Sequence, residues 1–268
     1  MAITMPEPLT YAFMQRALIA GVLLSAVAGY FSPFIVQRRM AFLGSGLAHA
    51  AFGGVALGIV LQFDPVLVAL PFTILIGIGI VLIREKTELA GDTAIGILFA
   101  VAMAVGILLL SSTQQYAGDV MTYLFGSILA VQNADLAWAG GLTALTLICA
   151  RWWPVWAYAT VDERLARVDR LHVKRIELAL VISVAIMIVV SAKIIGILLV
   201  SAFLVLPGAT ARLVAHSFAG MTAWSCTFAV GGAVIGLLGS YYTDVPSGPA
   251  IVLLQAGVFF VVAAATRR

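Results

Sequence analysis

Long apolar segments alternate with short polar ones along nearly the whole chain. Most of these segments approach the roughly 20 residues that a helix needs to cross the hydrocarbon core of a bilayer. The pattern therefore predicts an all-α polytopic membrane protein with about eight or nine transmembrane helices. The segments lie near residues 11–36, 42–62, 65–83, 89–110, 134–150, 174–192, 194–216, 219–240 and 249–266.

Two places leave the number of spans open. The stretch DVMTYLFGSILAV, from Asp119 to Val131, is too short to cross a bilayer alone, and polar residues bound it. It predicts a short re-entrant or interfacial helix near 120–131. Lys193 lies where two segments join with almost no loop, so one long tilted helix over 174–206 is the alternative there.

The composition places the chain far outside the class of soluble domains. Of its 268 residues, 63% are hydrophobic and 10% are charged, and the mean hydropathy is +1.12. Soluble domains are about 45–50% apolar and about 25% charged. The net charge of +3 does not indicate a nucleic-acid partner, because the basic residues lie in short loops between the predicted spans.

These basic residues also predict an orientation in the membrane. All but Arg16 and Lys193 of the 15 lysines and arginines fall on one side of the predicted bilayer. The positive-inside rule makes that side cytoplasmic, with the N-terminus periplasmic and the C-terminus cytoplasmic. The apolar run after Arg16 continues to Val36, so we interpret it as a retained span rather than a signal peptide. No linker or strong repeat divides residues 1–268, which we expect to form a single transmembrane domain.

Residues 151–175 form the one polar segment of any length. Within it, Leu165, Val168 and Leu171 recur at three-residue spacing among charged residues, which is typical of a short amphipathic helix. We expect this helix near 162–169 on the cytoplasmic side. It either lies on anionic lipid or docks a cytoplasmic protein.

The segment from Arg38 to Gly58 combines many small residues with a single histidine, His49. Small residues let helices approach closely in a membrane, whereas an ionisable group at that depth is costly and usually functional. Imidazole is a common metal ligand, so His49 is a candidate ligand for a transition metal, with a structural hydrogen bond as the alternative. Asp92, one turn into the fourth segment, is expected within a turn or two of His49 in depth. Its alternative role is to complement the dipole of a helix start.

Sequence motifs for common enzyme chemistry are absent. There is no G-x-x-x-x-G-K-[ST] phosphate loop and no H-E-x-x-H metalloprotease motif. We therefore assign no catalytic residues, and we expect neither an ATPase site nor a permanently bound cofactor.

Five motifs follow one another along the chain: RRMAFLGSGLAHAAFGGVALG from Arg38, DTAIGILFA from Asp92, YLFGSILAV from Tyr123, GILLVSAFLVLPGATARL from Gly196 and YYTDVPSGPAIVL from Tyr241. In this order and with these loop lengths, the chain resembles the membrane-spanning permeases of bacterial ABC importers for zinc, manganese and related transition metals. The zinc-uptake branch is the most similar, and the resemblance covers nearly the whole chain.

The resemblance implies a homodimeric permease of the bacterial inner membrane, with zinc as transported substrate and manganese or iron as alternatives. The implied partners are two copies of a separate ABC ATPase, a periplasmic metal-binding protein and the lipid bilayer. The implied ATPase-coupling residues are Asp162, Glu163, Leu165, Ala166 and Val168. A proton-coupled secondary metal transporter, which would also place His and Asp in the membrane, is the rival class.

One position departs from the family pattern. Relatives usually carry an aspartate four residues before the histidine, where this chain has Ser45. A carboxylate at i and an imidazole at i+4 form half a site for a divalent cation, whereas a hydroxyl is a poor ligand. Ser45 stays a candidate with His49 and Asp92, and the missing charge leaves the metal open. Asp64 and Asp244, beside prolines in outer loops, form either turns or a mouth that receives metal.

Overall fold

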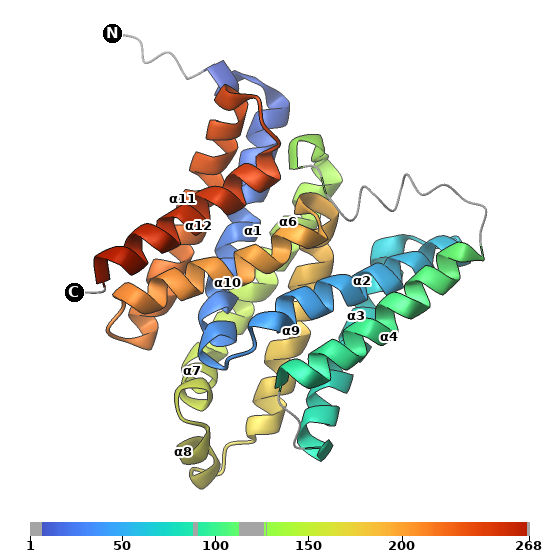
Figure 1. Ribbon diagram of the computed structural model, residues 1–268, viewed down its shortest axis with the longest axis vertical. Coiled ribbons are helices and arrows are strands. Elements are labelled where there is room, and N and C mark those ends of the chain that lie inside the picture. The colour runs from blue at the N-terminus through green and yellow to red at the C-terminus, as the bar shows by residue number, and fades with distance from the viewer. Residues whose placement is uncertain (1–6, 88–90, 113–125, 127, 267–268) are drawn as a thin grey trace.

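The computed structural model describes residues 7–87, 91–112, 126 and 128–266, and every regular element in these ranges is helical (Figure 1). A helix occurs at each of the nine predicted apolar segments, which confirms the all-α membrane class. These helices are α1 (Ala12–Gln37), α2 (Ala41–Leu61), α3 (Pro65–Thr87), α4 (Gly91–Ser111), α6 (Asn133–Cys149), α9 (Val173–Ile195), α10 (Ile197–Val214), α11 (Phe218–Thr243) and α12 (Ser247–Thr266).

In the described part of the chain, seven of these helices are long and apolar enough to cross a membrane. The two shorter ones are α6, with 17 residues, and α10, with 18. The chain continues from α6 through a 3-10 turn, η3 (Ala150–Trp152), into α7 (Trp153–Val161) and then α8 (Glu163–Val168). A total of eight or nine spans therefore requires α6 or α10, or both, to cross as well.

Gly196 separates α9 from α10. Its backbone angles, φ 85° and ψ 152°, belong to a region that glycine adopts readily and other residues avoid. The break ends α9 and gives α10 a new direction, so a single long helix over 174–206 does not form. Lys193, in the last turn of α9, pairs with Asp135 near the start of α6, with 2.8 Å between Nζ and Oδ1. This ion pair accounts for a lysine at the end of the bundle that carries few basic residues.

Most of the predicted re-entrant helix near 120–131 lies outside the described residues. The part that is described includes Gly126 and a 3-10 turn, η2 (Ile128–Ala130). Gly126 packs so closely on the α9–α10 break that a Cβ there would lie 2.2 Å from the backbone nitrogen of Gly196. This segment therefore covers the break between the two helices. A further 3-10 turn, η1 (Glu7–Thr10), precedes α1.

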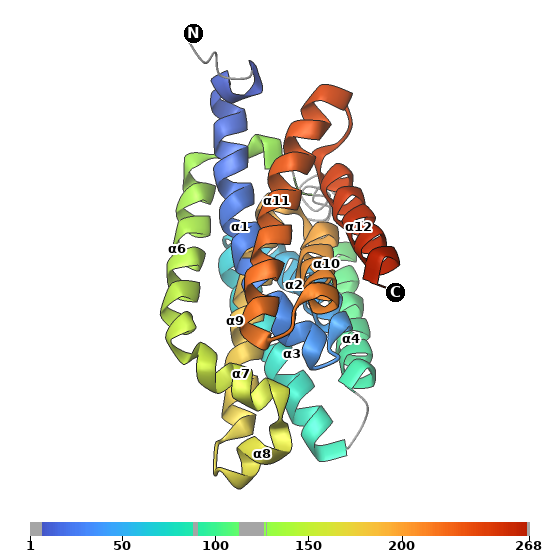
Figure 2. The ribbon, with the colours of Figure 1, turned by 90° about the vertical axis from the view of Figure 1, so that its left-hand side faces the viewer.

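α1 is the central helix of one half of the molecule, where α6 and α11 flank it (Figure 2). A Cβ on Gly29 would lie 2.8 Å from the Cα of Cys226, so α1 and α11 touch through their backbones. The backbone N–H of Gly208 on α10 donates to the hydroxyl of Ser32 at 2.8 Å. Such close approaches are how helices associate in lipid, where burial of apolar surface provides little driving force.

The other half is built around α2, whose glycines let the neighbouring helices pack closely against it. A Cβ on Gly46 would lie 2.3 Å from a methyl carbon of Ile95 on α4, and one on Gly53 would lie 2.6 Å from the carbonyl oxygen of Ala102. The second contact lies seven residues further along both helices than the first, so α2 and α4 run parallel, as Figure 1 also shows. The small residues from Arg38 to Gly58 therefore serve close packing, as predicted.

Candidate functional site

His49 lies two turns into α2 and is only partly buried, although most of its neighbours on the helix are fully buried. Its ring meets the edge of Phe99 on α4, with 5.1 Å between the ring centres and perpendicular planes. The parallel packing of α2 and α4 thus holds the imidazole between two helices. A side chain in this setting has a fixed position and still retains access to the surroundings.

The backbone of α2 selects the tautomer of His49. Its Nδ1 lies 2.7 Å from the carbonyl oxygen of Ser45, one turn earlier. A carbonyl oxygen only accepts hydrogen bonds, so Nδ1 is the donor, and in the neutral imidazole Nε2 then keeps its lone pair. A histidine that donates one N–H to a carbonyl and offers its other nitrogen is the usual arrangement of a metal-binding imidazole.

Both contacts between Ser45 and the ring are at Nδ1. The hydroxyl oxygen of Ser45 is 3.5 Å from Nδ1, the nitrogen that already donates to the Ser45 carbonyl. In this rotamer the Ser45 hydroxyl therefore contacts the ring at Nδ1. The shorter contact of Ser45 with the imidazole is made by its backbone carbonyl oxygen.

Asp92 occupies the first turn of α4 and is exposed. It precedes Phe99, the ring partner of His49, by seven residues, which is about 10 Å along a helix. The two candidate residues thus face the same helix pair, two turns apart in depth, and one ion does not bridge them in this conformation. No side chain in the described part of the chain forms an ion pair or hydrogen bond with the Asp92 carboxylate, which remains available.

One copy of the chain supplies few of the ligands that a metal needs. Among the described residues, no group of three or more His, Cys, Asp or Glu side chains is placed to hold a metal ion. Stable transition-metal sites usually use at least three protein ligands. The arrangement at His49 therefore suits transient contact better than permanent binding.

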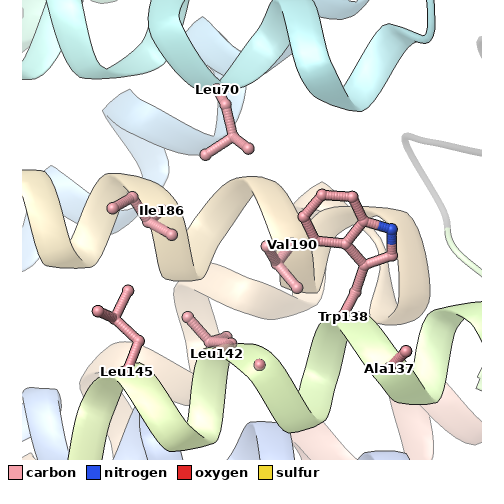
Figure 3. A pocket seen from close by; sticks show the side chains of 8 residues that line it. Leu70, Ala137, Trp138, Leu142, Leu145, Ile186 and Val190 are labelled. Atoms are coloured by element: carbon pink, nitrogen blue, oxygen red, sulfur yellow. The ribbon is translucent and has the colours of Figure 1, made fainter. Parts of the chain in front are cut away.

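A separate cavity of about 350 Å³ lies between α3, α6 and α9 (Figure 3). Among the described residues that line it, only Trp138 has a polar side-chain atom, the indole nitrogen, which Figure 3 shows at one end of the cavity. The described residues that line it offer neither a carboxylate nor an imidazole. The residues that line it are Leu70, Ala137, Trp138, Gly141, Leu142, Leu145, Ile186 and Val190.

Asp64 and Asp244 both have local roles at helix ends. The Asp64 carboxylate caps α3 by accepting the backbone N–H groups of Val66 and Leu67, at 2.9 and 3.2 Å. Asp244 ends α11 with a left-handed backbone, φ 53°. These findings support the alternative that each acid forms a turn. The residues directly after Asp244 nevertheless line a cavity of about 640 Å³, together with the α9–α10 break and η2.

The predicted amphipathic helix near 162–169 is α8. The Asp162 carboxylate caps its first turn by accepting the backbone N–H of Leu165 at 2.8 Å. Glu163 and Arg167, one turn apart, form an ion pair with 2.5 Å between Oε1 and Nη2. Such contacts stabilise a helix that is too short to persist by itself.

α8 has one buried face and one exposed apolar face. Ala166 is fully buried against α7 and α9, whereas the side chains of Leu165 and Val168 are 48% and 75% exposed. The Tyr158 hydroxyl on α7 donates to the carboxylate of Asp169, which raises the pKa of Tyr158 to about 12 and ties α7 to the end of α8. α8 lies at the tip of the molecule, opposite the start of α1 (Figures 1 and 2).

Two polar links above α8 were not predicted from the sequence. Arg38 Nε donates to the hydroxyl of Thr160 at 2.9 Å, and Arg84 pairs with Glu177, with 2.8 Å between Nη2 and Oε1. The partners in each link are about 90 to 120 residues apart. The only sequence signal was that both arginines end apolar segments, a pattern that the positive-inside rule already explains.

Comparison with known proteins gives consistent matches over the whole chain. The sequence model of the ABC 3 transport family matches residues 10–266. The chain is 32% identical over 244 residues to the high-affinity zinc uptake system membrane protein ZnuB of Haemophilus influenzae, covering 91% of this chain and 94% of that protein. It is also 32% identical over 253 residues to the manganese transport system membrane protein MntC of Listeria monocytogenes, covering 94% and 90%.

One similar solved structure is that of PsaBC from Streptococcus pneumoniae in complex with Fab. A chain in it superposes on this one with a TM-score of 0.83 at 32% identity, and the alignment covers 95% of this chain and 92% of that one.

Proposed function

Because this chain belongs to the ABC 3 transport family, a family of metal-uptake permeases, we propose that it carries zinc from the periplasm to the cytoplasm in an ATP-driven importer. Seven apolar helices and the resemblance of the chain to membrane proteins of metal-uptake systems support this proposal. The permease contributes the path for the ion. Permeases of this kind do not themselves hydrolyse ATP, which a partner subunit performs.

The observation that carries the proposal is the 2.7 Å contact between His49 Nδ1 and the Ser45 carbonyl oxygen. Because Nδ1 is bonded to this carbonyl, Nε2 of the neutral imidazole has a lone pair ready for a cation inside the membrane-spanning part of the chain. A neutral imidazole can take up and release a divalent ion without itself changing protonation. This property suits a transit site, which binds the ion strongly enough for entry and weakly enough for release.

The residues at this site favour zinc over manganese. Imidazole nitrogen suits zinc, whereas manganese prefers carboxylate and other oxygen ligands. This chain keeps the imidazole at position 49 and has Ser45 in place of the carboxylate. Manganese or iron remains the alternative substrate. Deleting the gene in its host should stop growth in medium from which zinc has been chelated, and added zinc should restore it. Restoration by manganese alone would reassign the metal.

We further propose that two copies of the chain form the importer with two ABC ATPase subunits and a periplasmic metal-binding protein. A second copy would add ligands to the ion that a single His49 cannot hold alone. The exposed Leu165 and Val168 of α8 give the ATPase an apolar contact, and the cavity beside Asp244 lies near the end that would receive the binding protein. ATP binding and hydrolysis would then switch the path between outward and inward access.

The charge distribution supports an orientation with the α8 end in the cytoplasm. Arg84, Lys86 and the basic residues of 151–175 lie at or near that end of the bundle, where the positive-inside rule applies. With an odd number of spans, the N-terminus is periplasmic and the C-terminus cytoplasmic. If a cysteine placed at Lys86 reacted with a membrane-impermeant thiol reagent in intact cells, this orientation would be wrong.

Replacing Ser45 with aspartate should tighten metal binding and slow release. The new carboxylate would lie one turn below the imidazole and add a charged oxygen ligand. We expect the zinc concentration for half-maximal uptake to fall about tenfold, as the gain of one charged ligand implies, with a lower maximal rate. Initial uptake rates over a range of zinc concentrations measure both quantities.

Ser45→Ala is the matched control for this variant. It removes the hydroxyl and keeps the backbone carbonyl that orients His49. Uptake by Ser45→Ala should therefore stay close to that of the unmodified chain. Loss of uptake in this control would show that the hydroxyl itself binds the ion.

A further inference from the structure

The turn between α1 and α2 is tied to the base of α8. Arg38, directly after α1, donates from Nε to the Thr160 hydroxyl at 2.9 Å. Thr160 lies two residues before Asp162, which caps α8, and only 9% of Thr160 is exposed. A charged donor in a nearly buried hydrogen bond makes a stronger link than a neutral surface contact.

The guanidinium of Arg38 is placed among carboxylates that it does not bind directly. Burial lowers the pKa of Arg38, and the nearby charges of Glu177 and Glu163 oppose that effect. In the described part of the chain, the buried Nη2 of Arg38 has no hydrogen-bond partner. The hydrogen bonds and the nearby charges of the Arg38 guanidinium therefore depend on where α7 and α9 lie, and a shift of α7 changes them.

A second set of contacts fixes the start of α2. Met40, the residue before α2, is buried, and its sulfur accepts from Arg84 Nη1 at 3.6 Å. The Nη2 of the same guanidinium pairs with Glu177 on α9, whose side chain is 9% exposed. The first residues of α2 are thus held on one side by Arg38 and α7, and on the other by Arg84 and α9.

α2 itself can carry a displacement from this turn to His49. From Ala41 to His49 is about 12 Å along one uninterrupted helix. The glycine contacts with α3 and α4 make α2 part of a closely packed unit, so its start and its middle move together.

We propose that Arg38 and Thr160 are positioning residues that transmit movement of α8 to α2, and so link ATP hydrolysis to access at His49. This inference rests on the proposed function, because it requires an ATPase that docks on α8. Neither residue touches the ion. Their hydrogen bond would instead determine how much of the α8 movement in each ATPase cycle is transmitted to α2, which carries His49.

The test uses the full importer in proteoliposomes and measures zinc taken up per ATP hydrolysed. Thr160→Val removes the hydroxyl at nearly constant volume, and Arg38→Met removes the Nε donor and the charge from the other side of the link. In each variant we expect ATP hydrolysis to persist and zinc uptake per ATP to fall about tenfold, the factor typical of one lost charged hydrogen bond. Thr160→Ser keeps a hydroxyl and should retain the unmodified ratio.

Combining the two variants separates coupling from simple damage. If the hydrogen bond transmits movement, the double variant should be no worse than either single variant, because both remove the same link. Additive losses, or a normal ratio in Thr160→Val and Arg38→Met, would overturn the proposal. If both variants fail to assemble with the ATPase, the link is a folding contact and the proposal is also wrong. Absence of ATP-driven zinc uptake by the unmodified importer would instead contradict the proposed function.

Discussion

Replacing His49 with alanine should abolish metal uptake, with a loss of at least about 100-fold in the initial rate. Loss of an outer contact to a metal ligand already costs about 10–100-fold in affinity or activity, so loss of the ligand should cost more. The variant gives up one hydrogen bond to the Ser45 carbonyl and the ring contact with Phe99. Loss of both contacts destabilises the fold by only about 2 kcal/mol, so α2 should still form and pack through its glycines.

The measurement is uptake of zinc by cells that express equal amounts of each protein in the membrane. His216→Ala, which removes a histidine two residues after the end of α10, is the matched control and should keep normal uptake. If His49→Ala is present and still transports normally, His49 is not part of the path. If it fails to fold, the histidine has a structural role.

Replacing both Leu165 and Val168 with aspartate should release the ATPase from the permease. The two side chains are exposed in the single chain and would be buried by a docked partner. Loss of their burial costs about 3 kcal/mol, which weakens binding more than a hundredfold, and the added charges weaken it further beside Asp162 and Glu163. Co-purification of the ATPase with the permease measures this effect directly.

A conservative pair, Leu165→Met with Val168→Ile, keeps the apolar surface and should retain the ATPase. The permease itself should reach the membrane in both cases, because the buried residue of α8 is Ala166. If the aspartate variant keeps normal ATPase co-purification and normal uptake, α8 lies on lipid instead.

The sequence was sufficient to predict the helices, because spanning helices require local runs of apolar residues. The join at Lys193 stayed open between two segments and one long helix, and the backbone of Gly196 decides for two helices. The short α8 followed from the three-residue spacing of apolar residues among charged ones. In each case the signal lies within a few residues of the element that it predicts.

The geometry of the candidate site was less predictable. The sequence identified His49 but not the Ser45 carbonyl that selects its tautomer, because a backbone acceptor leaves no trace in residue identity. It placed Asp92 near His49 in depth, and only the register of α2 on α4 shows the two-turn separation. The link from Arg38 to Thr160 joins residues 122 positions apart, and no periodicity in one chain reveals such a pair.

The central claim is that this chain forms an ATP-driven path for a transition metal, and one measurement tests it most directly. The purified chain and its ATPase would be reconstituted right side out in the membrane of proteoliposomes. The zinc-loaded binding protein would be added to the outer solution, and the vesicle interior would hold ATP and a fluorescent zinc indicator. Zinc should accumulate inside only when both ATP and the ATPase are present, and the His49→Ala variant should remove the signal. Accumulation by the chain alone, driven by a pH gradient and indifferent to ATP, would contradict the account and identify a proton-coupled transporter.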